Sequence, residues 1–200
     1  AILYMDIGNY EQAELLYAES LQIGEKVLGT RHPEYAKSCI NLALLYRTLG
    51  QYDKAERLFI EARQVLGEVL GKEHFEYAKS CNNLGALYMG IGDYDKAAPL
   101  YDEARQIWKK VLGNEHPEYA KSCNNLALIY WNKGEYEKAE PLFLETNQIR
   151  EKVFGKNHPD YAEGCDNLGV LYVDMGKYSN ALTLHLLARQ IREAVLGKEH

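Results

Sequence analysis

The sequence predicts an all-α solenoid built from antiparallel helix pairs, and three observations support this. The octapeptide His-Pro-Glu-Tyr-Ala-Lys-Ser-Cys begins at His32, and near-copies begin at His74, His116 and His158, each 42 residues after the one before. Apolar residues within a copy recur at steps of three and four, as they do on one face of a helix. Glycines stand where those helices are expected to end. A fixed period of roughly 20 to 50 residues indicates a repeat array.

The period divides the chain into one partial repeat and four full repeats. Residues 1–31 hold the end of a repeat: the last turns of a first helix at 1–7, a turn at Gly8-Asn9, and a second helix at 10–28. Full repeats are expected over 32–73, 74–115, 116–157 and 158–199, and residue 200 opens a further, truncated repeat. We therefore expect the chain to be a piece of a longer protein.

The repeat over 74–115 shows how the helices are predicted. A first helix is expected at about 75–89 and a second at about 94–112, because Gly92-Asp93 and then Gly113 interrupt the pattern. Glycine accepts the left-handed conformation that ends a helix, and aspartate caps the helix that follows. Repeats that begin His-Pro place the proline at the first helical position, where its missing N–H is not needed. The inward face of the first helix is expected to comprise Tyr77, Cys81, Leu84, Gly85 and Tyr88.

Small residues recur where two helices are expected to approach closely. Two places in the second helix show this. The first is alanine in all four full repeats, and the second, seven residues later, is alanine in three of them and Thr146 in the fourth. A larger side chain would hold the helices apart, so the pattern predicts close packing. The two sets are Ala55, Ala97, Ala139 and Ala181, and Ala62, Ala104 and Ala188.

Composition restricts the class of protein. Hydrophobic residues make up 46% of the chain, enough for a continuous core, and the net charge of −6 weighs against a nucleic-acid partner. No apolar run approaches the length of a membrane span. We expect a soluble, cytoplasmic protein that contacts neither nucleic acid nor membrane.

Each full repeat carries one cysteine at the same place: Cys39, Cys81, Cys123 and Cys165. Equivalent atoms in stacked repeats lie about 10 Å apart, whereas a disulfide needs Cα atoms within about 7 Å. The cysteines are therefore expected to be small buried residues in a reducing compartment.

The histidines at 32, 74, 116 and 158 cannot converge on one metal ion for the same reason. We expect them in loops, hydrogen-bonded across the junction between hairpins. The sequence contains no Gly-rich phosphate loop, GxSxG or HExxH motif. We expect no enzymatic activity and no cofactor.

The repeated residues resemble a known family. Leu-Gly/Ala-x-x-Tyr, then Gly-x-Tyr-x-x-Ala, then Phe/Tyr and Ala in the second helix is similar to the tetratricopeptide repeat. The 42-residue length and the Leu-Gly-x-x-His-Pro-x-Tyr-Ala linker resemble repeats of the kinesin-light-chain type. The resemblance implies a right-handed superhelix of helix pairs, with a concave groove lined by the first helices. It implies protein–protein recognition as the function.

Residues off the inward face of the first helices are the candidate peptide-binding residues. An asparagine occupies one place in all four full repeats, and a lysine precedes it by one helical turn in three of them. Side-chain amides pair with the backbone of an extended peptide, and lysine attracts carboxylates. The candidates are Lys37, Asn41, Arg47, Lys79, Asn82, Asn83, Met89, Lys121, Asn124, Asn125, Trp131 and Asn167.

The resemblance also implies the chemistry of the partner. In the wider family, lysine and asparagine at matching places hold acidic peptide tails, and kinesin light chains hold acidic segments with an aromatic residue. We expect a protein or peptide partner that is acidic and carries an aromatic or apolar anchor. The last repeat departs from the pattern, because Glu163, Asp166 and Asp174 replace basic or neutral residues.

Alternatives remain for each feature. The asparagines could tie neighbouring helices together, and Trp131 could fill a packing gap instead of binding a partner. Trp108 is expected on the surface of a second helix, and His185 is expected to be structural. The alternative function is a structural or regulatory arm that packs against an effector domain of its parent protein or associates end to end.

Overall fold

The computed structural model describes residues 1–197, and its regular structure there is entirely helical. Residues 198–200, which include the expected opening of a further repeat, lie outside the described residues. The helices are α1 (Ile2–Asp6), α2 (Tyr10–Leu28), α3 (Pro33–Thr48), α4 (Tyr52–Val69), α5 (Phe75–Gly90), α6 (Tyr94–Leu112), α7 (Pro117–Asn132), α8 (Tyr136–Phe154), α9 (Pro159–Asp174) and α10 (Tyr178–Leu196).

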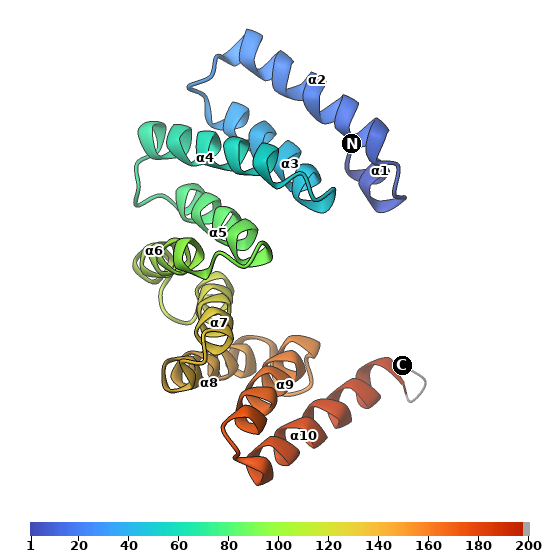
Figure 1. The fold of residues 1–200 in the computed structure, drawn as a ribbon, viewed down its shortest axis with the longest axis vertical. Coiled ribbons are helices and arrows are strands. Elements are labelled where there is room, and N and C mark those ends of the chain that lie inside the picture. Colours follow the sequence, from blue (N-terminus) through green and yellow to red (C-terminus); the bar gives the residue numbers. More distant parts are fainter. Residues whose placement is uncertain (198–200) are drawn as a thin grey trace. The chain divides into compact units, whose positions relative to one another are not determined.

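The helices form two compact units. The first unit spans Ala1–Ile107, and the second begins at Trp108, so the boundary falls within α6. In the first unit each helix from α1 to α5 packs against the next, and in the second unit the same holds from α7 to α10 (Figure 1). The predicted all-α class of antiparallel helix pairs is confirmed.

Glycine and aspartate end and begin the helices as their conformational preferences predict. Gly92 lies at φ 82° and Gly113 at φ 86°, the left-handed region where a side chain would be strained. The backbone N–H of Lys96 donates to Oδ1 of Asp93 over 3.1 Å, which caps α6. The first helix of this repeat ends one residue later than expected, at Gly90.

The repeated histidines have a different role from the one expected. Each is the N-cap of a first helix, and its Nδ1 accepts a hydrogen bond from the backbone N–H two residues later. For His116 the acceptor lies 3.2 Å from the amide nitrogen of Glu118. The expected bond across the hairpin junction is therefore wrong, because the side chain satisfies a free N–H in its own first turn.

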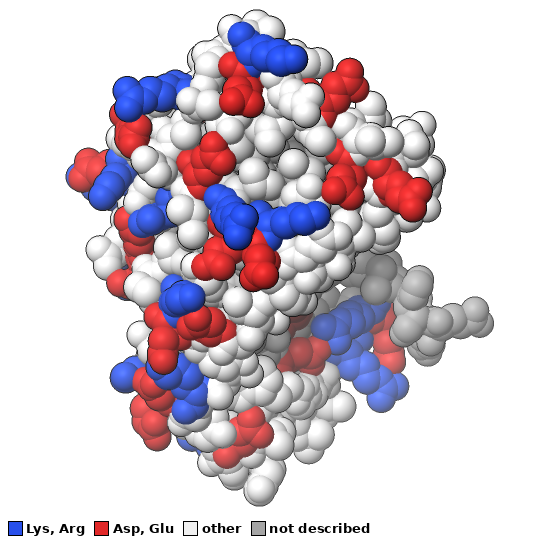
Figure 2. Space-filling model, turned by 45° about the horizontal axis from the view of Figure 1, so that its top comes forward, with Lys and Arg blue, Asp and Glu red and all other residues white. Residues whose placement is uncertain are grey.

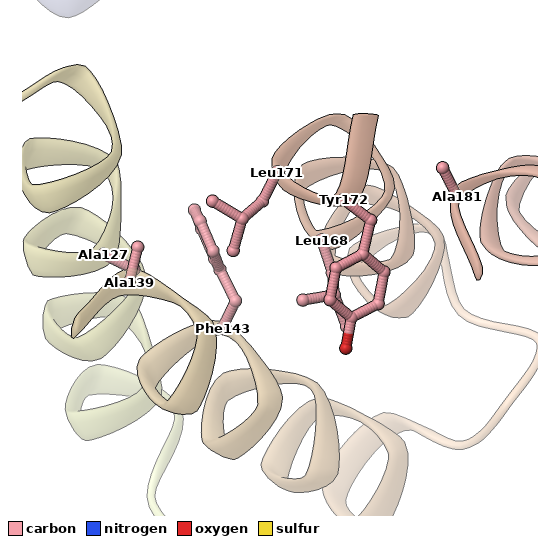
Figure 3. Close-up of a cluster of buried hydrophobic side chains, with 7 residues drawn as sticks. All are labelled: Ala127, Ala139, Phe143, Leu168, Leu171, Tyr172 and Ala181. Atoms are coloured by element: carbon pink, nitrogen blue, oxygen red, sulfur yellow. The ribbon is translucent and has the colours of Figure 1, made fainter. Parts of the chain in front are cut away.

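Alternating large and small side chains build the core. In the second unit, Phe143 of α8 lies with Leu168 and Leu171 of α9 (Figure 3), and Ala139 and Ala181 are almost fully buried. Close packing at the alanine positions is thus confirmed. Thr146, the exception, is also fully buried and its hydroxyl donates to the Ala120 carbonyl over 3.2 Å. That bond meets the cost of placing a hydroxyl in the core.

The four cysteines are buried and free of disulfides, as expected. Burial raises the pKa of Cys39 to about 12 and that of Cys81 to about 11. Cys81 nevertheless has polar neighbours, because Nε of Arg63 lies 3.1 Å from its sulfur atom.

The prediction about Trp108 in the second helices is wrong. Trp108 was expected at the surface, and its side chain is fully buried. Its counterpart Leu66 is also fully buried, so this position belongs to the interior of the array.

Candidate functional site

Three candidate residues of the first unit come together between α3 and α5. Lys37, Ile40 and Asn41 of α3 and Glu76 and Lys79 of α5 line a hollow of about 300 Å³. Lys37, Asn41 and Lys79 are exposed, whereas Ile40 is buried and forms an apolar floor. Asn83 follows Lys79 by one turn of α5 and is half-buried. Amide, ammonium and apolar groups thus share one surface.

The two lysines of this hollow differ in their pairing. Nζ of Lys37 lies 2.7 Å from Oε1 of Glu34, and this bond raises the pKa of Lys37. Lys79 forms no ion pair with another described residue. Lys79 is therefore the cation most available to a partner.

Arg47 and Met89 lie at the far ends of the same helices and are half-buried. The hydroxyl of Tyr101 lies 4.0 Å from the sulfur of Met89. Burial raises the pKa of Tyr101 and the charge of Arg47 lowers it, so Arg47 is also near this tyrosine. Both candidate anchors therefore pack against the interior on one side and face solvent on the other.

A second hollow of about 300 Å³ lies in the second unit, lined by Lys121, Asn124 and Asn125 of α7, Arg150 and Phe154 of α8, and Glu163 of α9, among others. One cation of this hollow, Arg150, is already paired with groups of the protein itself. Nη1 of Arg150 donates to the Asp160 carbonyl over 3.0 Å, and Nη2 lies 3.5 Å from Glu163. Arg150 is not among the candidates predicted from the sequence. It occupies the same place in its repeat as Trp108, and that place was predicted to lie on the surface of a second helix.

Asn82 and Asn124 were expected in the groove, and the structure instead leaves each only 5% exposed. Asn124 lines the second hollow and also bonds to the neighbouring repeat. Nδ2 of Asn167 on α9 donates to Oδ1 of Asn124 on α7 over 3.2 Å. This bond joins α9 to α7 in the second unit.

Trp131 bridges two repeats in the second unit. Its indole Nε1–H donates to Oδ2 of Asp174 on α9 over 2.6 Å. The ring also packs partly against the core of Ala127, Phe143 and Leu171. Trp131 is half-buried and Asp174 is exposed, so both present surface to solvent.

The last repeat contains a polar group that sequence reasoning missed. Nδ1 of His185 lies 2.9 Å from Oδ1 of Asp166, and the Arg192 guanidinium pairs with the other oxygen of the same carboxylate. His185 replaces the Phe or Tyr of other repeats, and Gly169 leaves room for its ring. The sequence does carry a signal for this group. The repeat that has His185 also has Asp166 at a place where the other full repeats have Asn or Ile.

The charged surface is mixed. On the face shown in Figure 2, lysine and arginine lie beside aspartate and glutamate and do not gather into one basic patch. Among residues 1–197, no group of His, Cys, Asp and Glu side chains is arranged to hold a metal ion. None of the helices in that range is long and apolar enough to span a bilayer.

Comparison with known families decides the assignment. A model of the tetratricopeptide repeat matches residues 1–68, 38–98, 76–146 and 123–194. The chain belongs to the tetratricopeptide repeat family. Such repeats mediate protein–protein interaction. No curated protein sequence matches the chain significantly.

Solved structures agree with this assignment. The chain is similar to BtubC (BKLC) from P. vanneervenii, with 26% identity, a TM-score of 0.87, and coverage of 98% of this chain and 78% of BtubC. It is also similar to a putative kinesin light chain from Podosopora anserina, with 26% identity, a TM-score of 0.82, and coverage of 96% and 90%. The Rap conjugation gene regulator of plasmid pLS20, in complex with the Phr* peptide, shares the fold at 17% identity, with a TM-score of 0.71 and coverage of 96% and 51%.

Proposed function

We propose that the protein is an interaction scaffold whose α3–α5 surface binds a short acidic segment of a protein partner. The observation that carries this proposal is the hollow lined by Lys37, Asn41 and Lys79. Lys79 is exposed and has no ion-pair partner among the described residues. An unpaired ammonium attracts a carboxylate more strongly than one already paired.

Asparagine side chains supply the second part of the proposed interaction. Asn41 and Asn83 carry both a donor and an acceptor. An extended peptide that lies across α3 and α5 presents backbone N–H and C=O groups to such amides without any demand on its sequence. Arg47 and Met89, half-buried at the far ends of the two helices, then contact the anchor side chain of the partner.

The second unit has its own candidate residues, Lys121, Asn125 and Trp131 of α7 and Asn167 of α9. Lys121 is exposed and, like Lys79, has no ion-pair partner among the described residues. Three acidic residues, Glu118, Asp160 and Glu163, line the second hollow, against one, Glu76, in the first, so the second hollow is less favourable for an acidic ligand. We therefore assign the acidic segment to the first unit. A peptide as ligand is compatible with this fold, since the Rap regulator is in complex with one.

Fluorescence polarisation with a labelled peptide tests the proposal. The probe is a dodecapeptide rich in Asp and Glu with one central Trp, titrated with the protein at about 50 and 500 mM salt, where screening differs strongly. We expect binding that weakens about tenfold at high salt and about threefold to tenfold in Lys79→Gln. Arg57→Gln is the matched control, because Arg57 is an exposed cation of α4, outside the hollow. Equal affinity of Lys79→Gln and the unmodified protein would contradict the proposal.

Self-association is the second candidate function, and exposed apolar residues favour it. Leu15, Ile23 and Val27 of α2 are 54–73% exposed, and Leu182 and Leu186 of α10 are 61% and 54% exposed. Contiguous apolar surface marks interaction sites. Sedimentation equilibrium over a hundredfold range of concentration tests this. A mass that rises with concentration, and that Leu182→Gln with Leu186→Gln returns to the monomer value, supports a second copy as partner. A constant monomer mass excludes it.

A further inference from the structure

Several tyrosines of this protein share a three-part arrangement. In each, the tyrosine hydroxyl donates a hydrogen bond to a carboxylate, and a lysine or arginine lies over the ring. Tyr46 donates to Glu14 over 3.0 Å, with Nζ of Lys54 4.8 Å from the ring centroid. Tyr88 donates to Glu56 over 2.6 Å, with Lys96 at 4.9 Å.

The arrangement recurs on the opposite end of the first helices. Tyr77 donates to Glu103 over 2.9 Å, with Arg63 at 5.1 Å from its ring. Tyr119 donates to Glu145 over 2.8 Å, with Lys109 at 5.9 Å. An aromatic ring attracts a cation placed within about 6 Å of its face, and the hydrogen-bonded carboxylate adds a negative charge beside it.

Trp131 and Asp174 have the first two parts of this arrangement and lack the third. The indole N–H donates to Oδ2 of Asp174 over 2.6 Å. No lysine or arginine of residues 1–197 lies over the Trp131 ring, and Asp174 accepts no bond from another described residue. Indole is also the side chain that binds cations best.

Exposure separates this pair from the buried tyrosines. Tyr35 also donates to a carboxylate, Glu61, and has no cation over its ring, but it is only 5% exposed and closed to a ligand. Trp131 is half-buried and Asp174 exposed, so one side of the pair is open to solvent. The bond to Trp131 holds the Asp174 carboxylate in place and leaves its second oxygen, Oδ1, unpaired.

We propose that Trp131 and Asp174 form a binding site for a lysine or arginine side chain of a protein partner. The cation lies over the indole ring and pairs with Oδ1 of Asp174, which completes the arrangement seen at the tyrosines. This inference goes beyond the acidic-peptide proposal and does not depend on it, because that proposal concerns α3 and α5.

The test follows the indole N–H resonance of Trp131 by nuclear magnetic resonance during titration with a small probe. The probe is the capped tripeptide acetyl-Gly-Lys-Gly-amide, and its uncharged counterpart has norleucine in place of lysine. We expect the lysine probe to shift the Trp131 resonance at concentrations about tenfold lower than the norleucine probe. The resonance of the buried Trp108 stays unchanged and serves as an internal control.

Two charge-neutralising variants of α9 complete the test. Asp174→Asn keeps an acceptor for the indole N–H and removes the charge, so we expect it to abolish the preference for lysine. Glu163→Gln removes the same charge from an exposed residue with no bond to Trp131 and should keep the preference. Equal responses to the two probes in the unmodified protein, or an unchanged preference in Asp174→Asn, would overturn the inference. Failure of the acidic dodecapeptide to bind would leave it standing.

Discussion

The hydroxyl of Tyr77 on α5 donates a hydrogen bond to Oε1 of Glu103 on α6, and Arg63 of α4 pairs with the other oxygen of that carboxylate over 2.7 Å. The same tyrosine–glutamate bond joins Tyr35 to Glu61 over 2.7 Å and Tyr119 to Glu145 over 2.8 Å. The last full repeat has Leu187 at the glutamate position. This tyrosine–glutamate hydrogen bond, here called the polar clasp, joins the two helices in each of the first three full repeats.

Removal of the clasp should destabilise the first unit. Glu103→Ala leaves the Arg63 guanidinium and the Tyr77 hydroxyl without their shared acceptor, at a cost of about 1–3 kcal/mol. Tyr77→Phe removes one bond and should cost about 1 kcal/mol. Urea denaturation followed by circular dichroism measures both. Tyr52→Phe, at an exposed tyrosine, is the control and should leave the midpoint unchanged. Equal midpoints for Glu103→Ala and Tyr52→Phe would show that the clasp contributes nothing.

Lowering the pH should weaken the hydrogen bonds to Glu103 and reduce the stability of the first unit. Burial alone would raise the pKa of Glu103, but the bonds from Arg63 and Tyr77 outweigh it and hold the pKa below the ordinary 4.5. A carboxyl whose folded pKa is lowered contributes stability above its unfolded pKa, and that stability is lost as the pH falls through the folded pKa. We expect stability to fall below about pH 4.5. In Glu103→Gln this fall should be smaller, and an identical pH profile would contradict the assignment.

Gly169 and His185 should depend on each other. A Cβ at position 169 would lie 2.8 Å from two ring atoms of His185. Gly169→Ala should therefore destabilise the second unit by about 1–3 kcal/mol. Two other full repeats have alanine and phenylalanine at these places, and in one of them Ala127 packs in the same core as Phe143. The double change Gly169→Ala with His185→Phe should recover most of the loss, which a double-mutant cycle of denaturation midpoints measures. Additive losses would refute the coupling.

Thiol reactivity should report on the burial of the first helices. Because burial raises the pKa of Cys39 to about 12 and of Cys81 to about 11, both stay protonated at neutral pH. The thiolate is the reactive form. We expect an aromatic disulfide reagent to leave all four cysteines unmodified in the folded protein and to modify all four in denaturant. Rapid modification of the folded protein would contradict the packing.

The fold was largely predictable because periodicity and helix punctuation act locally. Gly92 and Asp93 end one helix and begin the next whatever surrounds them. The burial of Trp108 was not predictable by comparing the repeats, because the next two repeats have arginine at the same place, Arg150 and Arg192. Arg150 shows why: its guanidinium bonds to the Asp160 carbonyl, so a long polar side chain also fits there.

The candidate site was predictable only in part. Helical spacing placed Lys37, Asn41 and Lys79 beside one another, and they line one hollow. The same spacing did not reveal that Asn82 and Asn124 are buried. Contacts between repeats, such as Trp131 with Asp174, join residues 43 apart. They depend on how side chains of two helices meet, which a single repeat does not encode.

The most direct measurement is a map of backbone amide shifts on titration of the protein with the acidic dodecapeptide. The proposed function predicts that the perturbed amides concentrate at Lys37, Asn41, Lys79 and Asn83, on α3 and α5, and that the exposed face of α4 around Arg57 stays unchanged. Perturbations confined to α4, or none at concentrations that saturate polarisation, would contradict a binding surface formed by the first helices.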